Sequence, residues 1–363
     1  MPIHELNKNS EELLTVNTHM GLFRYRRLCY GVSSSPAIFQ SVMDRILAGI
    51  PNVVCRIDDI LITAPDDSCH LRNLNEVLTR LQKHNIKLNE NKCSWLEDSV
   101  IYMGHIVDKH GLRPTVDKLK AISEAPRPEN VSQLKSYLGL LGYYRSFLPN
   151  LATKLNPVHE LLKSGVPWSW TNECERVFNE TKDMVVNSKI LVHYDVNKPV
   201  TLACDSSSYG IGAVLSHTME DGTERPIMFA SRSLTSSEKN YSQIHRESLS
   251  LIYGVKKFHK YLYGRHFRLI TDHSSLTTIL GPKTGVPTMA AARLQRWAVT
   301  LSAYDYDIVY RKSADHARFP MKDVDIPDEE SYVLHVDDSQ IPIDTRDIAE
   351  ATGKHPVLCK VLD

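Results

Sequence analysis

Three acidic residues in the second half of the chain stand where a fold could bring their carboxylates together. Asp205 follows an apolar run that begins at Val200, Glu247 lies in a segment with the apolar spacing of an amphipathic helix, and Asp272 follows the β-prone run 267–271. Carboxylates delivered by a strand, a helix and a second strand can converge on a divalent cation, which prefers oxygen ligands. The sequence therefore predicts a metal site formed by these three residues.

Each of the three acids also has a simpler explanation. Asp205 could form an Asx turn between two strands, Glu247 could be a solvated helix residue, and Asp272 could be the N-cap of a following helix. The serines after Asp205, together with Gly210 and Gly212, favour a close approach of another backbone or of a phosphate to this strand. A metal site accounts for all three acids at once, whereas the simpler explanations must each hold separately.

A second acidic pair, Asp58 and Asp59, lies between the β-rich runs 53–57 and 60–63. This pattern predicts a hairpin that carries two carboxylates at its turn. Asp is common in turns, so a turn alone explains the pair; the apolar residues on both sides equally favour a bound cation that offsets the repulsion between the acids.

A basic and aromatic run lies between Glu247 and Asp272 in the sequence. Its pattern is typical of a solvated helix face with aromatic anchors, but a cationic surface beside an acidic metal site is also what a polyanionic substrate requires. We therefore predict a nucleic-acid-binding surface made by Lys256, Lys257, Lys260, Arg265 and Arg268.

Periodicity predicts the elements that position these residues, in a mixed α+β arrangement. Helices are expected at 35–47, 70–84, several between 115 and 163, 171–187 with Thr171 as its cap, a long helix at 237–263, and 291–302. Strands are expected around 87–88, 102–107, 200–215, 227–231, 267–271 and 306–310.

The composition is that of an ordinary soluble protein. The chain has 363 residues, 42% of them hydrophobic and 24% charged, and its formal net charge is zero. The seven cysteines are scattered without zinc-ligand spacing, and no apolar run has the length of a signal peptide core or a membrane span. We expect an intracellular protein, cytoplasmic or nuclear, with free thiols and no membrane partner.

Several longer motifs resemble the reverse transcriptase and ribonuclease H polyprotein of gypsy-class LTR retrotransposons, over about residues 14–320. Residues 21–25, 28–40 and 57–61 resemble palm motifs, residues 138–147 resemble the connecting helical region, and the settings of Asp205, Glu247 and Asp272 resemble the ribonuclease H domain. The resemblance implies a multidomain α+β fold: a partial reverse transcriptase palm (1–112), a small helical thumb or connection region (113–165), a ribonuclease H-like mixed α/β domain (166–320) and an acidic linker or tail (321–363).

The resemblance also implies a role for each acid. Asp58 and Asp59 match the polymerase acidic pair, which with a third Asp upstream would hold two Mg²⁺ ions for nucleotidyl transfer. Asp205, Glu247 and Asp272 match three of the four ribonuclease H carboxylates, which would hold two Mg²⁺ ions and act as an endonuclease on the RNA strand of RNA/DNA hybrids.

The chain departs from this family's pattern in three places. The palm strand that carries the upstream catalytic Asp is expected before residue 14 and is missing, and Arg56 stands where the family has an aromatic residue beside the primer end. The segment that carries the fourth ribonuclease H carboxylate is missing between Ala317 and Arg318, and neither Asp315 nor Asp323 stands at the matching position.

These departures predict no polymerase activity and weak or no ribonuclease H activity. Two other interpretations stay open at this stage. One is a non-catalytic nucleic-acid-binding scaffold, and the other is an unstable pseudogene product, in which the part before Lys118 unfolds while residues 166–320 stay folded.

Overall fold

The computed structural model describes residues 5–29, 31–188, 190–281 and 292–312. These residues form two compact units that divide between Leu96 and Glu97. The four-domain division expected from the sequence stays a prediction.

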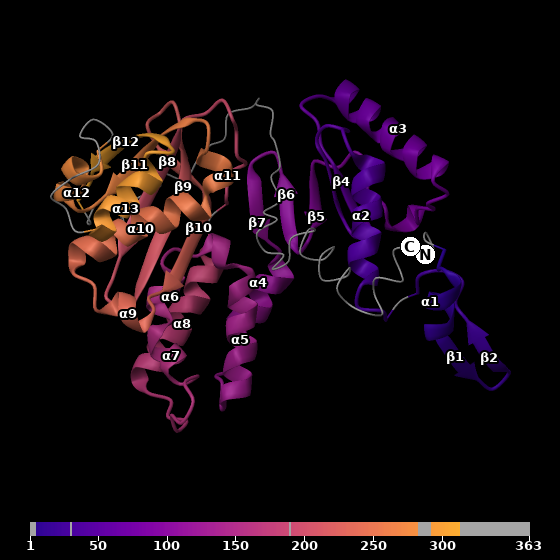
Figure 1. Ribbon diagram of the computed structural model, residues 1–363, viewed down its shortest axis with the longest axis horizontal. Helices are drawn as coiled ribbons and strands as arrows, with labels where there is room; N and C mark the ends of the chain where they lie inside the picture. Colours follow the sequence, from indigo (N-terminus) through magenta and orange to yellow (C-terminus); the bar gives the residue numbers. More distant parts are fainter. Residues whose placement is uncertain (1–4, 30, 189, 282–291, 313–363) are drawn as a thin grey trace. The chain divides into compact units, whose positions relative to one another are not determined.

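The first unit contains two short hairpins and two longer helices (Figure 1). Its elements are α1 (Lys8–Leu13), β1 (Thr15–Thr18), β2 (Gly21–Arg24), α2 (Ser35–Leu47), β3 (Val53–Arg56), β4 (Asp59–Ile62), α3 (Asp67–Lys83) and a 3-10 turn at Glu90–Lys92. Helices α2 and α3 pack their apolar faces on the β3–β4 hairpin, with Met43, Val77 and Leu81 almost completely buried. The predicted helices at 35–47 and 70–84 and the hairpin at 53–63 are confirmed, whereas residues 87–88 are not in a strand.

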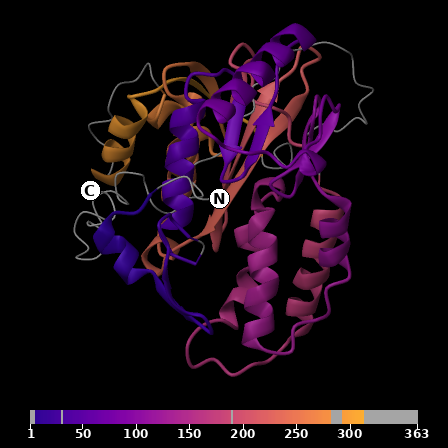
Figure 2. The ribbon, with the colours of Figure 1, turned by 90° about the vertical axis from the view of Figure 1, so that its right-hand side faces the viewer.

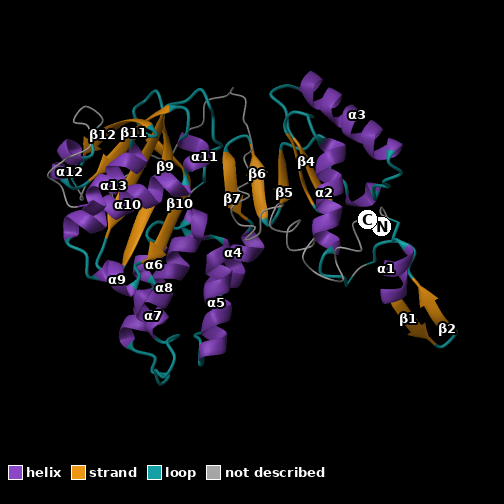
Figure 3. Cartoon of the chain, in the orientation of Figure 1, coloured by secondary structure: helices purple, strands orange, loops and turns teal. Residues whose placement is uncertain are grey.

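The second unit begins with a three-stranded antiparallel sheet, which a helical segment follows (Figure 3). The sheet consists of β5 (Ser99–Tyr102), β6 (His105–Asp108) and β7 (Gly111–Pro114). The helical segment consists of α4 (Val116–Ser123), α5 (Val131–Tyr143), a 3-10 turn at Arg145–Phe147, α6 (Leu151–Lys154), α7 (Asn156–Glu160) and α8 (Asn172–Val186). Helices α5 and α8 lie side by side (Figure 2), and Tyr137 packs its ring on Phe178 at 4.7 Å between centroids. Thr171 caps α8 as predicted.

A five-stranded mixed sheet with the order β10-β9-β8-β11-β12 follows. Its elements and the helices between them are β8 (Val200–Ser206), β9 (Gly210–Thr218), β10 (Glu224–Ser233), α9 (Ser236–Lys239), α10 (Gln243–Lys257), α11 (His259–Leu262), β11 (His266–Thr271), α12 (Ser274–Ile279), α13 (Ala292–Leu301) and β12 (Asp305–Tyr310). The first three strands pair antiparallel, and β8–β11 and β11–β12 pair parallel.

Alternation along the strands gives this sheet two buried faces. Leu202, Leu215 and Leu269 belong to the main core with helices α10, α11 and α13, whereas Ala203, Val214 and Ile270 form a second apolar layer on the opposite face. Phe229 joins that second layer to the core of the helical segment. The sheet is therefore covered by helices on one face and by the helical segment on the other.

The long helix predicted at 237–263 is wrong, because the structure has three helices there. Thr235 and Glu238 form a capping box that starts α9, and Ser242 is the N-cap of α10. Ser and Asn compete with the helix backbone for hydrogen bonds, so they favour caps over helix interiors. Phe258 ends α10, and α11 continues the chain for four residues.

This packing predicts where the chain can be cut. A fragment 97–363 keeps the helical segment on the sheet and should unfold as one cooperative unit, whereas a fragment 166–363 exposes the layer around Phe229. We expect the shorter fragment to bind a hydrophobic dye and to aggregate, with dye fluorescence and light scattering as the measurements. A shorter fragment that is as stable and monomeric as the longer one would contradict this packing.

Candidate metal centre

The register of two neighbouring parallel strands brings Asp205 and Asp272 together. Strands β8 and β11 pair with Leu202 opposite Leu269 and Ala203 opposite Ile270. Asp205 lies two residues after Ala203 on β8, and Asp272 lies two residues after Ile270, directly after the end of β11. Alternation puts the Asp205 side chain on the face of β8 that Ala203 occupies.

Glu247 reaches the same place from α10, which packs against β8 and β9. A close approach is possible because Gly254 lies over the strands: a Cβ there would be 2.6 Å from Cys204 Sγ. Ser206 Oγ donates a hydrogen bond to Glu247 Oε1 at 2.8 Å. The helix position and this hydrogen bond hold the Glu247 carboxylate at the end of β8.

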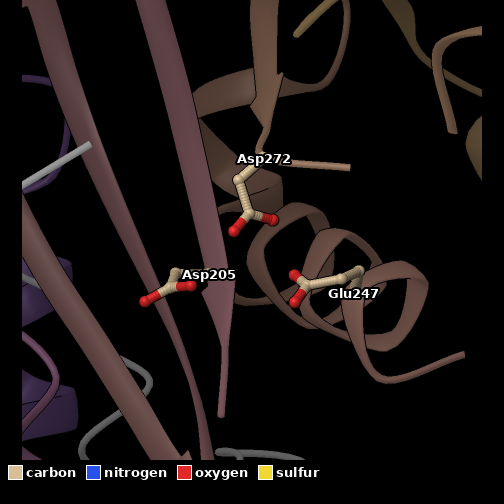
Figure 4. Close-up of side chains that lie close together, drawn as sticks. All are labelled: Asp205, Glu247 and Asp272. Atoms are coloured by element: carbon tan, nitrogen blue, oxygen red, sulfur yellow. The ribbon is translucent and has the colours of Figure 1, made fainter. Parts of the chain in front are cut away.

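The three carboxylates converge as the sequence predicts. One oxygen each of Asp205, Glu247 and Asp272 lies within 4.8 Å of the other two, and Figure 4 shows the three side chains directed toward a common space. Glu247 is 2% exposed, and the two Asp side chains are half-buried. Among the residues described, this is the one group of three or more acid, His or Cys side chains with metal-binding spacing.

The electrostatics of the cluster are unfavourable without a counter-charge. Burial above all, together with the neighbouring charges of Asp272 and Asp205, raises the pKa of Glu247 to about 8, and the Ser206 hydrogen bond only partly opposes this rise. Glu247 Oε2 and Asp272 Oδ1 are buried and have no hydrogen-bond donor. Ionised carboxylates are acceptors only, so either a proton or a cation has to lie between these oxygens. A divalent cation, which takes oxygen ligands, fits this donor set.

The simpler explanations for Asp205 and Asp272 are wrong. Ser207, not Asp205, makes the turn after β8, because its Oγ accepts hydrogen bonds from the backbone N–H groups of Tyr209 and Gly210 at 3.2 and 3.0 Å. The N-cap residue of α12 is His273, so Asp272 is not a cap. Glu247 is not a solvated helix residue either, because it is buried.

The acidic pair Asp58 and Asp59 lies in a different environment. Arg56 pairs with Asp59 across the β3–β4 hairpin, Asp58 lies in the turn, and both carboxylates are exposed. Gln40 of α2 holds the turn, because its amide donates to Cys55 O at 2.9 Å and accepts from Ile57 N at 2.6 Å. In the described part of the chain, no third acid, His or Cys joins the pair at metal-binding distance.

The predicted basic residues do not lie beside the carboxylates. Lys256 and Lys257 are nine and ten residues after Glu247 on the same helix, so they lie about 13 to 15 Å from it along the axis. Arg268 precedes Asp272 by four residues on β11, about 13 Å along the strand. Lys260 lies in α11, beyond the end of α10.

Arg265 is engaged within the fold. Its guanidinium donates hydrogen bonds to Tyr194 Oη at 2.6 Å and to Lys198 O at 2.5 Å, and it lies over the Tyr194 ring at 5.4 Å from the centroid. This side chain anchors the turn before β11.

Sequence reasoning missed two residues that contact the acids, namely Ser206 and Asn150. Asn150, 55 positions before Asp205, donates a hydrogen bond from Nδ2 to Asp205 Oδ2 at 3.3 Å. The signal in the sequence was the glycine pair after Asp205, which predicts a close approach without saying which segment makes it. Asp315, Asp323 and the acidic tail 321–363 lie outside the described residues.

Comparison with known proteins matches both halves of the chain. A family model described as "Reverse transcriptase (RNA-dependent DNA polymerase)" matches residues 3–107, and one described as "RNase H-like domain found in reverse transcriptase" matches residues 195–304. None of the helices in the described residues is long and apolar enough to cross a membrane.

Among curated proteins, the retrovirus-related Pol polyprotein from transposon opus of Drosophila melanogaster is 33% identical over 324 residues, which are 85% of this chain and 32% of that protein. The Pol polyprotein from transposon 297 of the same organism is 34% identical over 86% of this chain and 29% of its own length. The Tf2-3 polyprotein of Schizosaccharomyces pombe is 31% identical over 86% of this chain and 24% of its own length. The chain thus spans a third or less of these relatives.

Solved structures with the same fold include the foamy viral protease-reverse transcriptase in complex with dsDNA. It has a TM-score of 0.72 and 22% identity, and the match covers 85% of this chain and 65% of that one. The same enzyme in complex with an RNA/DNA hybrid has a TM-score of 0.70 and 20% identity, over 90% of this chain and 44% of that one. The chain thus contains a segment that matches reverse transcriptases, followed by an RNase H-like domain, and over most of its length it is similar to retrotransposon Pol polyproteins.

Proposed function

We propose that the RNase H-like domain of this chain binds Mg²⁺ at Asp205, Glu247 and Asp272 and acts on RNA/DNA hybrids as a slow endonuclease. The observation that carries the proposal is the convergence of three carboxylates within 4.8 Å, two of which have buried oxygens without a donor. The low rate is expected because the sequence lacks the segment that carries the family's fourth carboxylate. The family relationship and the hybrid complex of the foamy viral enzyme support the choice of substrate.

The chain's own residues would have distinct tasks at this site. Asp205 and Asp272 supply ligand oxygens from rigid strand ends, and Ser206 holds the Glu247 carboxylate for the same purpose. Burial of Glu247 limits the screening of its carboxylate by bulk water, which strengthens the attraction of the ionised group for a cation. Divalent cations bound at such a site activate water and offset the charge that develops on the phosphate.

We also propose that this chain by itself does not polymerise DNA. Three observations support this proposal. Asp58 and Asp59 are exposed, Arg56 lies opposite Asp59 in the hairpin, and among the described residues no third metal-binding side chain lies near the pair. Two exposed carboxylates in a turn bind a cation weakly, because water screens them and no further ligand completes the site.

The first test is cleavage of a labelled RNA/DNA hybrid. We expect slow Mg²⁺-dependent cleavage by the unmodified chain and a loss of about 100-fold or more in Asp205→Asn, because a ligand charge is removed. Asp221→Asn is the matched control, since Asp221 is an exposed loop acid whose carboxylate accepts hydrogen bonds from the backbone N–H and the hydroxyl of Thr223 in its own turn. The non-catalytic scaffold would be favoured instead if the unmodified chain binds the hybrid but neither cleaves it nor binds Mg²⁺, and if Asp205→Asn binds the hybrid equally well.

The second test is the pH dependence of stability in metal-free buffer. The pKa of Glu247 in the folded chain, about 8, exceeds its ordinary value of 4.5. The folded state therefore binds more protons between these values, and the free energy of unfolding falls as the pH rises through this window. Relative to Glu247→Gln, the unmodified chain should lose on the order of 2 to 4 kcal/mol between pH 5 and pH 9, measured by denaturant unfolding.

The groups that face Glu247 are Asp205, Asp272 and Ser206, so their charges and hydrogen bonds set this behaviour. Glu220→Gln, a change in an exposed loop, is the control and should leave the pH profile of the unmodified chain unchanged. Mg²⁺ should restore the lost stability at pH 9. A profile of Glu247→Gln that is parallel to that of the unmodified chain would show that Glu247 does not titrate in this range.

The third test is primer extension. The unmodified chain should not extend a DNA primer on an RNA template with Mg²⁺ and all four deoxynucleotides, under conditions in which an intact reverse transcriptase does. Gel analysis of the labelled primer gives the result. Extension that is abolished by Asp58→Asn would overturn the proposal that the acidic pair is inactive.

A further inference from the structure

Asn150 belongs to the helical segment but reaches into the RNase H-like sheet. It is the residue before α6 and has a left-handed backbone, with φ of 50° and ψ of 29°. Asn tolerates this conformation better than most residues do. Its side chain donates from Nδ2 to Asp205 Oδ2 at 3.3 Å.

The space for the Asn150 carboxamide exists because Gly212 has no side chain. Gly212 is the cross-strand partner of Asp205 in the β8–β9 pair, so the two residues face the same side of the sheet. A Cβ at Gly212 would overlap Asn150 Oδ1. Two residues earlier, a Cβ at Gly210 would lie 2.7 Å from Thr153 Oγ1. The two glycines thus form a flat surface on which the α6 turn rests.

Further hydrogen bonds fix this turn on the sheet. Thr153 Oγ1 lies 3.0 Å from Ser207 Oγ, and the backbone N–H of Ala152 donates to Ser231 Oγ at 3.1 Å. Leu151, at the start of α6, is buried in the core of the helical segment. Asn150 is therefore held between a packed turn and the end of β8, and its amide is oriented before any ligand arrives.

We propose that Asn150 is a positioning residue for the metal site, because it holds one Asp205 oxygen so that the other is presented to the cation. The inference rests on the proposed binding of Mg²⁺. In Figure 4 the Asp205 carboxylate directs one oxygen toward Glu247 and Asp272 and the other away from them. Hydrogen bonds to ligand carboxylates restrict their rotation, and their removal lowers metal affinity about 10- to 100-fold. Through Asn150, the helical segment sets the strength of a site that lies in another part of the chain.

The test compares Asn150→Gly with the unmodified chain by calorimetric titration with Mg²⁺. Glycine accepts the left-handed backbone readily and removes the whole side chain, the amide included. We expect the dissociation constant to rise about 10- to 100-fold. In the hybrid-cleavage assay, the Mg²⁺ concentration for half-maximal rate should rise by the same factor, and saturating Mg²⁺ should restore the maximal rate. If Asn150 acted only in folding, Asn150→Gly would lower the total heat of the Mg²⁺ titration and the maximal cleavage rate, but it would leave the dissociation constant and the half-maximal Mg²⁺ concentration unchanged.

Two further variants sharpen the test. Asn85→Gly makes the same replacement at another left-handed Asn, with φ of 56°, in the first unit, and should leave Mg²⁺ affinity unchanged. Gly212→Ala should weaken Mg²⁺ binding because its methyl group displaces the Asn150 amide. In the Asn150→Gly background the same methyl group has no carboxamide to displace, so Gly212→Ala should then have little effect on affinity or on unfolding.

The outcomes separate the inference from the proposed function. If the unmodified chain and Asp205→Asn both bind no Mg²⁺, the proposed function fails, and the role of Asn150 at the metal fails with it. The effect of Gly212→Ala on the free energy of unfolding, compared between the unmodified and the Asn150→Gly backgrounds, still reports whether Asn150 fills the space at Gly212. If the unmodified chain binds Mg²⁺ and Asn150→Gly binds it equally well, the positioning role alone is overturned. An equal loss of affinity in Asn85→Gly would overturn it too.

Discussion

The repulsion among three carboxylates at the ends of strands β8 and β11 is the constraint on which the rest of the RNase H-like domain depends. Asp205, Glu247 and Asp272 lie within 4.8 Å of one another, and Glu247 is buried. Like charges at this range are costly where water does not screen them, so the fold has to supply compensation. At low pH a proton on Glu247 does so, and at higher pH only a cation can. The pairing of β8 with β11 and the packing of α10 against the sheet hold the three carboxylates together despite this repulsion.

The charges along α10 follow a simpler rule. Glu247 lies in the N-terminal part of the helix, and Lys256 and Lys257 occupy its last turn. A helix dipole favours bases in the last turn, so the two lysines stabilise the helix whether or not nucleic acid binds, whereas Glu247 lies beyond the first turn, where this effect has faded. Sequence proximity between basic and acidic residues is therefore a poor guide to proximity in space when a helix separates them. Arg265 is a second example, because its guanidinium donates hydrogen bonds to Tyr194 Oη and to the backbone carbonyl of Lys198 and does not face the carboxylates.

Local pattern was sufficient for much of this structure. The strand that carries Asp205, the hairpin around Asp58 and the Thr171 cap follow from alternation, turn residues and capping, which depend on a few neighbouring residues. The convergence of Asp205, Glu247 and Asp272 was expected from the type of element each one ends or occupies. The break of the 237–263 segment was missed, because apolar spacing continues through Asn240 and Ser242 and hides the cap. Asn150 could not be found, since nothing near it in the sequence indicates a partner 55 residues away.

The two acidic groups of the chain differ in what they require of their surroundings. Asp58 and Asp59 are exposed, so water solvates them, and the hairpin is held by Gln40 and by apolar packing on α2 and α3 without any cation. Water does not solvate the cluster of Asp205, Glu247 and Asp272 in the same way, because Glu247 Oε2 and Asp272 Oδ1 are buried without a hydrogen-bond donor. Loss of metal binding therefore costs the hairpin little, whereas at the sheet it leaves an uncompensated charge or a proton that is lost as the pH rises. The buried cluster therefore requires a proton or a cation between its oxygens, and the exposed pair does not, so the cluster is the stronger candidate for a metal site.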